Sequence, residues 1–487
     1  MKNIVNNPFK IVFISLTSAL IFFSCHKDNM GLSQINVAVG PFTKELTVPS
    51  EVNGKGNTLI AKSATVELLS GGTSVFGYSG KILGPTIRIK SGESTSILFS
   101  NQLSEESNIH WHGLMIPANM DGHPGALINP NASFNYEFPV QQRAGTYWYH
   151  PHTHGKTASQ VTLGLSGFFI VNDDEEAGLN LPAGEYEIPV VIQDKRFKNG
   201  RDIDYSPTPM DVMSGYFGDH VLVNGLYSPV HKVSTRWYRL RVLNGSTARV
   251  YNLALSNNDN FYIIGSDGGL LRTAESVQNI LLAPGERADI LVDFKNTNVG
   301  DEIFLQSNSF DGGIQGNQSF RILKFQVNKS ENDSFILPST LSGIQALQAS
   351  ASKKTRTFDI ANAGHGAGHG GHGGGAGHSI NGLTFDMDRI DELINNGDTE
   401  TWIFDNSKGT DLHPMHIHGV QFQVIKREGG RGIITASEKG WKDTVLCLPG
   451  EKVSVIMTFL NHKGKFVFHC HNLEHEDDGM MLNFEIQ

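Results

Sequence analysis

The stretch GKFVFHCHNLEH (464–475), close to the end of the chain, has a counterpart in GTYWYHPHTHG (145–155). Each begins with a glycine, continues through four residues, mostly aromatic or β-branched, and reaches a His-x-His pair. Residues 91–114 and 396–420 also match, because each has a Gly-acid turn, a strand-like run ending in Asn, a polar loop and His-x-His-Gly. Two parts of the chain are therefore predicted to share one fold, with Cys470 in the later copy where the earlier copy has Pro151.

The rest of the 487 residues also indicates an all-β protein. Short β-rich runs recur between turn residues, long helical periodicity is nearly absent, and the length predicts more than one core. The stretch DRIDELINNG (388–397) is the one with helical spacing, and it is either a short helix or a loop. We predict three Greek-key β-sandwich domains, at 30–175, 176–328 and 354–487, with a polar linker at 329–353. The middle domain has only two histidines, His220 and His231, which are unpaired, so it is expected to bind no metal.

The net charge of −10 argues against nucleic-acid binding, which favours a basic face.

The first 25 residues combine lysines with an apolar run at 11–23 that is too short to span a bilayer comfortably. This pattern predicts an export signal. Ser24 and Cys25 resemble the lipobox of a bacterial lipoprotein. We therefore expect lipidation of Cys25 and a location in the bacterial cell envelope or periplasm; the alternative is an ordinary cleaved signal with an incidental cysteine.

Four His-x-His pairs mark the candidate metal site: His110/His112, His150/His152, His416/His418 and His469/His471. Residues i and i+2 of a strand point to the same face, so each pair presents two imidazoles to one side. One such pair could arise by chance. Four pairs in equivalent positions of two related domains predict a site for several metal ions, and imidazole suits copper and zinc.

The C-terminal segment distinguishes between these metals. Two histidines and a cysteine with a weakly bound methionine form the blue-copper ligand set. Cys470, His475 and Met480 provide three of these ligands, and His413, three residues before the His416/His418 pair, is the candidate for the fourth. A zinc site would favour more cysteines or a carboxylate and would not use methionine.

These motifs resemble the four signature motifs of the multicopper oxidase family, in family order. They are HWHG (110–113), HPHTHG (150–155), HPMHIHG (413–419) and HCHNLEHEDDGMM (469–481), and GWKDTV (440–445) is also similar to the family's third domain. The resemblance extends over essentially the whole mature chain as three cupredoxin-like domains. Within the family, the chain most resembles bacterial three-domain laccases and cuprous oxidases.

The resemblance implies four copper ions per chain. The blue copper would be held by His413, Cys470, His475 and Met480. In the three-copper cluster, His110 and His416 would hold the single normal copper, and the coupled copper pair would be held by His112, His150, His152, His418, His469 and His471. The cluster would reduce O2 to water with electrons that a reducing substrate delivers singly at the blue copper.

Two carboxylates, Glu476 and Asp121, occupy positions where the resemblance implies a general acid that delivers protons to the cluster. The alternative is that both only form hydrogen bonds that orient the ligands. Either role requires the carboxylates to lie beside the histidine pairs.

The electron donor is less clearly indicated. Met387, Asp388 and Asp411 fall in regions that resemble the family's substrate site. The acid-Met arrangement of cuprous oxidases, however, is replaced here by GTDL (409–412). A phenol or aromatic amine is therefore as compatible with the sequence as a metal ion such as Cu(I).

The Gly/His tract at 363–379 is either a labile copper trap or an insertion with incidental histidines; its histidines are His365, His369, His372 and His378. The trap supports an alternative function, a copper-sequestering periplasmic protein with incidental oxidase activity. A paralogue that has lost its metal is disfavoured because both ligand sets are complete.

Overall fold

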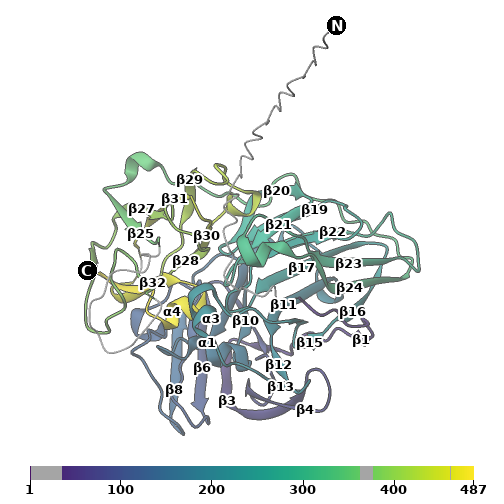
Figure 1. Cartoon of the computed structure of the whole chain (residues 1–487), viewed down its shortest axis with the longest axis horizontal. Coiled ribbons are helices and arrows are strands. Elements are labelled where there is room, and N and C mark those ends of the chain that lie inside the picture. Colours follow the sequence, from purple (N-terminus) through teal and green to yellow (C-terminus); the bar gives the residue numbers. More distant parts are fainter. Residues whose placement is uncertain (2–35, 362–376, 461) are drawn as a thin grey trace. The chain divides into compact units, whose positions relative to one another are not determined.

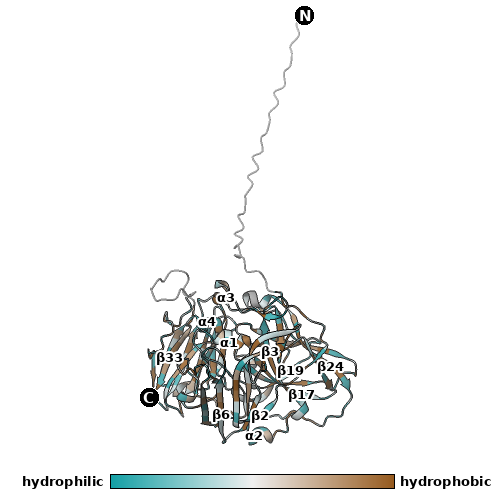
Figure 2. Ribbon diagram, turned by 90° about the horizontal axis from the view of Figure 1, so that it is seen from below, coloured by the Kyte–Doolittle hydropathy of each residue, from teal (hydrophilic) through white to brown (hydrophobic). Residues whose placement is uncertain are grey.

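The structure is a computed structural model that describes residues 1, 36–361, 377–460 and 462–487. Cys25, His365, His369 and His372 lie outside the described residues, so the expectations for them remain predictions. Strands dominate the described part and the helices are short, which confirms the all-β prediction. Hydrophobic residues lie along the strands (brown in Figure 2). None of the described helices is long and apolar enough to cross a membrane.

The first sandwich contains a four-stranded sheet and a five-stranded sheet. In spatial order, the four-stranded sheet consists of β4 (Gly72–Tyr78), β3 (Lys55–Glu67), β6 (Ser94–Asn101) and β8 (Ser133–Pro139). The other consists of β2 (Glu51–Asn53), β5 (Thr86–Lys90), β10 (Gly167–Asn172), β9 (Gly145–His150) and β7 (His110–His112). Burial alternates along β6, and Ile97 and Phe99 pack with Trp111 and Phe169 of the facing sheet.

The middle sandwich is larger. Its six-stranded sheet consists of β1 (Lys44–Glu45), β16 (Pro229–Ser234), β24 (Phe320–Lys329), β23 (Glu302–Ser307), β18 (Tyr251–Leu255) and β21 (Asn279–Leu282). Its seven-stranded sheet consists of β15 (Leu226–Tyr227), β14 (His220–Val223), β11 (Glu187–Lys195), β17 (Trp237–Asn244), β22 (Arg287–Asp293), β19 (Phe261–Ser266) and β20 (Gly269–Val277). A small ribbon pairs β12 (Phe197–Lys198) with β13 (Asp202–Ile203). Although β1 falls within the predicted first domain, it pairs with β16 of the middle one.

The third sandwich repeats the four-plus-five arrangement of the first. Its four-stranded sheet consists of β25 (Lys354–Asp359), β27 (Thr399–Asp405), β31 (Lys452–Thr458) and β29 (Gln423–Glu428). Its five-stranded sheet consists of β26 (Glu392–Ile394), β33 (Met481–Ile486), β32 (Gly464–Cys470), β28 (His413–Ile417) and β30 (Thr444–Cys447). Trp402 of β27 packs against Phe468 and Phe484 of the facing sheet, with ring centroids 5.0 and 5.7 Å away. Part of DRIDELINNG forms β26, because Leu393 and Ile394 pair with β33; the stretch is neither helix nor wholly loop.

Short helices connect the sheets. The α-helices are α1 (Thr157–Leu163), α2 (Asp174–Ala177), α3 (Pro209–Ser214) and α4 (Leu473–Asp477). The 3-10 turns are η1 (Ala118–Met120), η2 (Gly184–Tyr186), η3 (Gly313–Asn317), η4 (Ala349–Ala351) and η5 (Ala436–Glu438). One α-helix from each sandwich, α1, α3 and α4, gathers at one place, where α4 contacts both of the others (Figure 1). This is also where β32 ends, so the helices surround the segment that carries Cys470.

Candidate metal centre

The four histidine pairs lie on, or directly after, two antiparallel strand pairs that have the same register. His110 of β7 is opposite His150 of β9, and His416 of β28 is opposite His469 of β32. Because side chains alternate along a strand, each strand pair presents its histidines to one side and its apolar residues to the core of its own sandwich. The two sets of imidazoles therefore meet between the first and third sandwiches.

The eight rings of these pairs are all buried and their nitrogens converge. The close nitrogen–nitrogen distances are 3.4 Å for His110 Nε2–His416 Nε2, 3.4 Å for His150 Nε2–His112 Nδ1, 3.2 Å for His152 Nε2–His469 Nε2 and 3.2 Å for His418 Nε2–His469 Nε2. Two of these contacts, His110–His416 and His152–His469, join the first sandwich to the third, so the centre is built across the boundary between domains.

The second nitrogen of most of these rings is already bonded to an oxygen. Backbone carbonyls accept from Nδ1 of four of them, in the pairs His110–Asp121 (2.8 Å), His150–Pro151 (2.7 Å), His416–Asp443 (2.8 Å) and His469–Cys470 (3.0 Å). A neutral imidazole carries a single N–H group, so these bonds leave Nε2 of each ring as a lone pair.

Burial disfavours the charged form of His110, His150 and His416. Desolvation lowers the pKa of His150 to about 3 and places those of His110 and His416 well below the usual value. Lone pairs that face one another at hydrogen-bonding distance with no proton between them repel. A cation placed among them removes this repulsion, and the donor set therefore fits bound metal. Nε2 of His471 has no hydrogen-bond partner among the described residues and is also available to a metal.

Two aspartates orient the histidines in a reciprocal way. Asp121, in the first sandwich, accepts from His110 through its carbonyl and from His418 of the third sandwich through its carboxylate, 2.7 Å away. Asp443, in the third sandwich, accepts from His416 through its carbonyl and from Nε2 of His112 of the first through its carboxylate, 3.0 Å away. Each domain thus fixes a tautomer in the other. His112 consequently presents Nδ1 to the centre, whereas most of its neighbours present Nε2.

The role of Asp443 was not predicted from the sequence, although GWKDTV was singled out. Arg287 of the middle sandwich holds its carboxylate through two bonds of 2.7 and 2.5 Å, and both side chains are fully buried. Gly113 of the HWHG motif, with φ +85°, lies against this pair: a Cβ there would be 2.3 Å from the Asp443 carboxylate. The glycine in HWHG thus makes room for an ion pair provided by two other domains.

Glu476 lies beside the histidines, as expected for either of its predicted roles. Its carboxylate oxygens are 3.4 Å from Nδ1 of His152 and 3.1 Å from Nδ1 of His469, one ring from each sandwich. The side chain is almost fully buried. Asp121 is buried as well, and desolvation raises its pKa well above the usual value.

The cysteine and its companions form a second cluster on the opposite face of β32. Sγ of Cys470 is 3.5 Å from Nδ1 of His413 and 3.6 Å from Nδ1 of His475. Met480 is fully buried, and its backbone carbonyl accepts from the N–H of Cys470. Burial raises the pKa of the Cys470 thiol, so a bound cation is needed to keep it as thiolate. His413, Cys470 and Met480 also contribute to the buried interior of the third sandwich.

Family models described as "Multicopper oxidase" match residues 61–176, 194–320 and 349–487, with one model for each sandwich. The chain is 35% identical to "Multicopper oxidase mco" of Staphylococcus haemolyticus over 436 residues, which is 89% of this chain and 88% of that protein.

The chain belongs to the multicopper oxidase family.

Other relatives include "Laccase" of Bacillus subtilis, 32% identical over 85% of this chain and 90% of that protein. "Cell division protein FtsP" of Escherichia coli is 33% identical over 76% of each chain. Among solved structures, McoA multicopper oxidase from Aquifex aeolicus superposes with a TM-score of 0.84 at 34% identity and covers 91% of this chain and all of that one. The likenesses to multicopper oxidases and to the laccase confirm the prediction of cupredoxin-like domains and of an oxidoreductase. The exact domain boundaries stay predictions.

The residues predicted to face the donor lie in two places in this multicopper oxidase, with His378 and Asp411 near enough to interact electrostatically and Met387 apart from them. His378 is buried, and its ring stacks on that of His475 with centroids 3.8 Å apart. Met387 lies elsewhere: its sulfur lies against Gly125, and its carbonyl accepts from Lys465. The N–H of Asp388 donates to Asp386 in a local turn, and the carbonyl of Asp411 accepts from Asn406.

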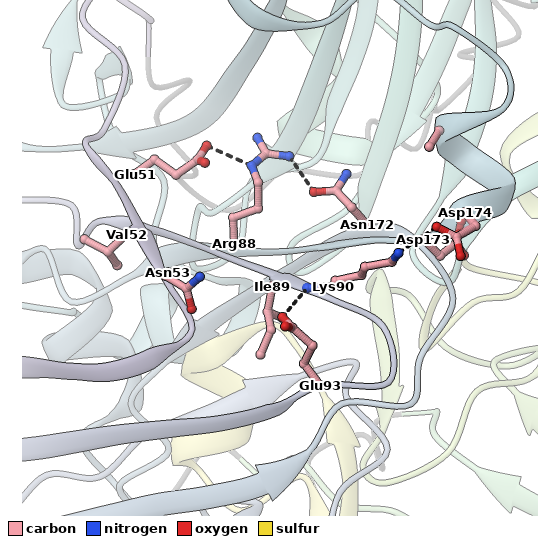
Figure 3. Close-up of a pocket in the computed structure, with 11 residues that line it drawn as sticks. Glu51, Val52, Asn53, Arg88, Ile89, Lys90, Glu93, Asn172, Asp173 and Asp174 are labelled. Atoms are coloured by element: carbon pink, nitrogen blue, oxygen red, sulfur yellow. Dashed lines mark hydrogen bonds and ion pairs between the residues drawn. The ribbon is translucent and has the colours of Figure 1, made fainter.

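A surface pocket of about 520 Å³ in the oxidase contains none of the predicted ligands. It is lined by β2, β5 and the residues after β10, and Arg88 there donates to Glu51 and Asn172 (Figure 3). Its lining residues are largely charged and paired with one another, without a cysteine or a histidine. This pocket therefore contributes nothing to the candidate metal centre.

Proposed function

We propose that this multicopper oxidase binds four copper ions and couples the one-electron oxidation of a reducing substrate to the reduction of O2 to water. Four donor electrons and four protons are consumed for each O2, and two water molecules are formed. The observation that carries the proposal is the set of buried imidazole lone pairs that converge at 3.2–3.4 Å. Only bound cations make such an arrangement favourable.

Each predicted ligand has a place in this scheme. His413, Cys470, His475 and Met480 would hold the blue copper; His110 and His416 would hold the normal copper; and the coupled pair would be held by His112, His150, His152, His418, His469 and His471. When bound, copper supplies one-electron redox chemistry at the blue site and O2 reduction at the cluster. Cys470 lies between His469 and His471 in the chain, so a few covalent bonds connect the two sites.

Side chains of the protein orient the metal ligands, exclude water from the cluster and supply protons. Asp121 and Asp443 fix which nitrogen each neighbouring ring presents, and complete burial of the rings excludes bulk water. Glu476 lies within reach of Nδ1 of His152 and His469 and would deliver protons to reduced oxygen, with Asp121 as a second acid. If Glu476→Gln has unchanged turnover at saturating donor, the proton role of Glu476 is wrong.

The donor we propose is a phenol, an aromatic amine or a reduced metal ion such as Cu(I). Relatives of both kinds support this range: the Bacillus subtilis relative is named a laccase, and a multicopper oxidase from Campylobacter jejuni, 29% identical with a TM-score of 0.80, is described as a metallo-oxidase. The contacts of Asp411 and Met387 do not favour one donor class over the other.

The test is oxygen consumption by the copper-loaded protein with Cu(I), Fe(II) and a phenol in parallel assays. We expect blue protein, about four coppers per chain by metal analysis, and consumption with at least one donor. The matched control is Cys470→Ser, which keeps the cluster histidines. Absence of blue colour and of consumption with every donor would contradict the proposal.

A second candidate function rests on the Gly/His tract at 363–379. In this alternative, the protein sequesters copper and its oxidase activity is incidental. Deletion of 363–379 tests it by equilibrium dialysis against copper. The alternative requires the deletion variant to bind fewer coppers than the parent beyond the four of the oxidase sites. Equal binding by parent and deletion variant would rule out the trap.

We also propose that the protein is exported to the bacterial cell envelope and lipidated on Cys25. The support is the N-terminal basic and apolar pattern that ends at Ser24-Cys25. Metabolic labelling with a radioactive fatty acid should mark the parent and not Cys25→Ala. Label retained in Cys25→Ala would refute lipidation at this residue.

A further inference from the structure

His378 lies directly over the predicted blue-copper ligand His475. The two imidazoles are nearly parallel, with centroids 3.8 Å apart and planes inclined by 19°. Only about 1% of His378 is exposed, and His475 is fully buried. One face of the ligand ring is therefore closed by another ring instead of by solvent.

The edge of His475 that points away from Cys470 is closed as well. Its Nε2 donates to the carbonyl of Met213, 3.1 Å away, and Nε2 of His378 donates to the neighbouring carbonyl of Val212, 3.2 Å away. The two stacked rings are thus held side by side by consecutive carbonyls of α3, a helix of the middle sandwich. Met210 of the same helix is 39% exposed, so α3 is the outermost layer at this point among the described residues.

Contacts at both ends hold α3 in place. Thr208 and Asp211 form a capping box at the start of α3, and Arg196 holds the Asp211 carboxylate through both guanidinium Nη atoms. Gly215 ends the helix with φ +103°, and a Cβ there would be 2.8 Å from the Asn472 side chain at the start of α4. The helix therefore packs tightly on the segment that carries His475.

We propose that His378 is the donor-side cover of the blue-copper site and determines which reducing substrates the oxidase accepts. The inference rests on the proposed function and deepens it. A stacked ring places one extra layer between His475 and a donor that approaches from this face, and electron transfer slows steeply with distance. The covered site favours donors that transfer an electron across α3, such as reduced metal ions, over phenols that would need to contact the ligand ring.

The cover also keeps water away from the ligand. A dry, low-dielectric surrounding destabilises the more highly charged Cu(II) and raises the reduction potential of the blue copper. His378 acts on the reaction through His475 and is therefore a positioning residue. Its removal should change the potential, a quantity that a merely structural residue elsewhere in the fold would not affect.

The experiment compares wild type, His378→Ala, His378→Phe and, as matched control, His220→Ala in the middle sandwich, where the ring bonds to Asp219. Each copper-loaded protein is titrated for the potential of its blue copper. Its anaerobic reduction is then followed by stopped-flow absorption with Fe(II) and with a phenol. In the phenol reaction one electron passes to the copper, Cu(II) becomes Cu(I), and the phenol releases its hydroxyl proton to solvent.

We expect His378→Ala to lower the potential and to increase the phenol rate about tenfold relative to the Fe(II) rate, a size typical of changes around a metal ligand. His378→Phe keeps a stacked ring and should retain the wild-type rate ratio, as should His220→Ala. If His378→Ala does not retain copper, His378→Val serves the same purpose, because its short side chain also uncovers the ring.

An unchanged potential and rate ratio in the uncovering variant would overturn the proposal, and so would equal effects of His378→Phe and His378→Ala. These failures are distinguishable from failure of the proposed function. If wild type is neither blue nor able to consume oxygen, the function is wrong; if wild type is blue and active, only the cover is in question.

Discussion

The first and third sandwiches use one strand frame for different purposes. In both, two histidine pairs face the shared centre, and an aspartate fixes a histidine of the other domain. On the opposite face, however, Pro151 of the first copy stands where Cys470 stands in the third. In both copies, one face of the strand pair thus provides ligands for the cluster. Only the third copy also provides ligands for a second metal site, the blue-copper site, on the opposite face.

The two aspartates differ in a similar way. Asp443 is paired with the buried Arg287 at 2.5 and 2.7 Å, whereas burial leaves Asp121 with a raised pKa. Matching positions therefore serve as a charged anchor in one copy and as a carboxyl group able to hold a proton in the other. The middle sandwich, which has no histidine pair, provides the cation that creates this difference.

The largest effect is expected from Cys470→Ser. It removes the thiolate that distinguishes the two copies, so blue absorption and oxygen consumption should fall to the detection limit while the cluster histidines remain. Visible absorption and metal analysis measure both outcomes. A variant that stays blue would overturn the assignment of Cys470.

The reverse change, Pro151→Cys, should create no second blue site, because the first copy lacks counterparts of His475 and Met480. New blue absorption in this variant would show that the comparison of the two copies is wrong.

Asp443→Asn should have the next largest effect. It removes the closest charge partner of the buried Arg287 and leaves only Asp267, 3.6 Å away, so the loss of stability should be no larger than the ~3–5 kcal/mol typical of a broken buried ion pair. It also weakens the bond to His112, so copper affinity should decrease about 10- to 100-fold. Thermal unfolding and copper competition with a chelator measure the two quantities. The double variant Asp443→Asn/Arg287→Met should recover much of the stability but not the affinity; recovery of both would show that Asp443 does not orient His112.

Asp121→Asn should disturb the centre less. No cation partner is left unpaired, and the amide oxygen can still accept from His418, so copper affinity should change by less than about tenfold. Turnover should nevertheless decrease, because an amide cannot deliver a proton. Steady-state oxygen consumption with metal content measured in the same sample separates the two effects. Full turnover with full copper would remove Asp121 from proton delivery.

The smallest effect concerns the acid stability of the metal-free protein. Burial lowers the pKa of His150, in the first copy, and of His413, in the third, from 6.5 to about 3. Because the unfolded chain takes up these protons first, stability is fully present above about pH 6.5 and decreases as the pH falls toward 3, by up to ~1.4 kcal/mol per pH unit for each group. Replacing either histidine by Gln should make urea unfolding less pH-dependent by similar amounts. An unchanged pH dependence in both variants would show that these rings do not resist protonation in the fold.

Much of this architecture is predictable from sequence because strand periodicity is local. The spacing of His110 and His112, or of His469 and His471, determines which face each side chain occupies before any tertiary contact is known. The repeat that relates residues 145–155 to 464–475 predicts two similar domains, and their registers agree with it.

The remaining features depend on contacts between residues that are distant in sequence. Nothing near Asp443 indicates that Arg287, 156 residues earlier, neutralises it, or that its carboxylate reaches His112. His378 belongs to a glycine-rich tract by sequence, yet it is buried on a ligand ring because α3 offers it a carbonyl. Residues 392–394 have helical spacing but form an edge strand, since pairing with β33 outweighs weak local preference.

The contact between His110 and His416 also has a consequence for the order of folding. These residues are 306 positions apart, so the centre between them closes one of the longest loops in the chain. Closing so long a loop carries an entropic cost that is recovered only after both flanking sandwiches exist. The three-copper cluster is consequently assembled only after both of these sandwiches, and copper supplied before the third sandwich is made would meet only the cluster ligands of the first.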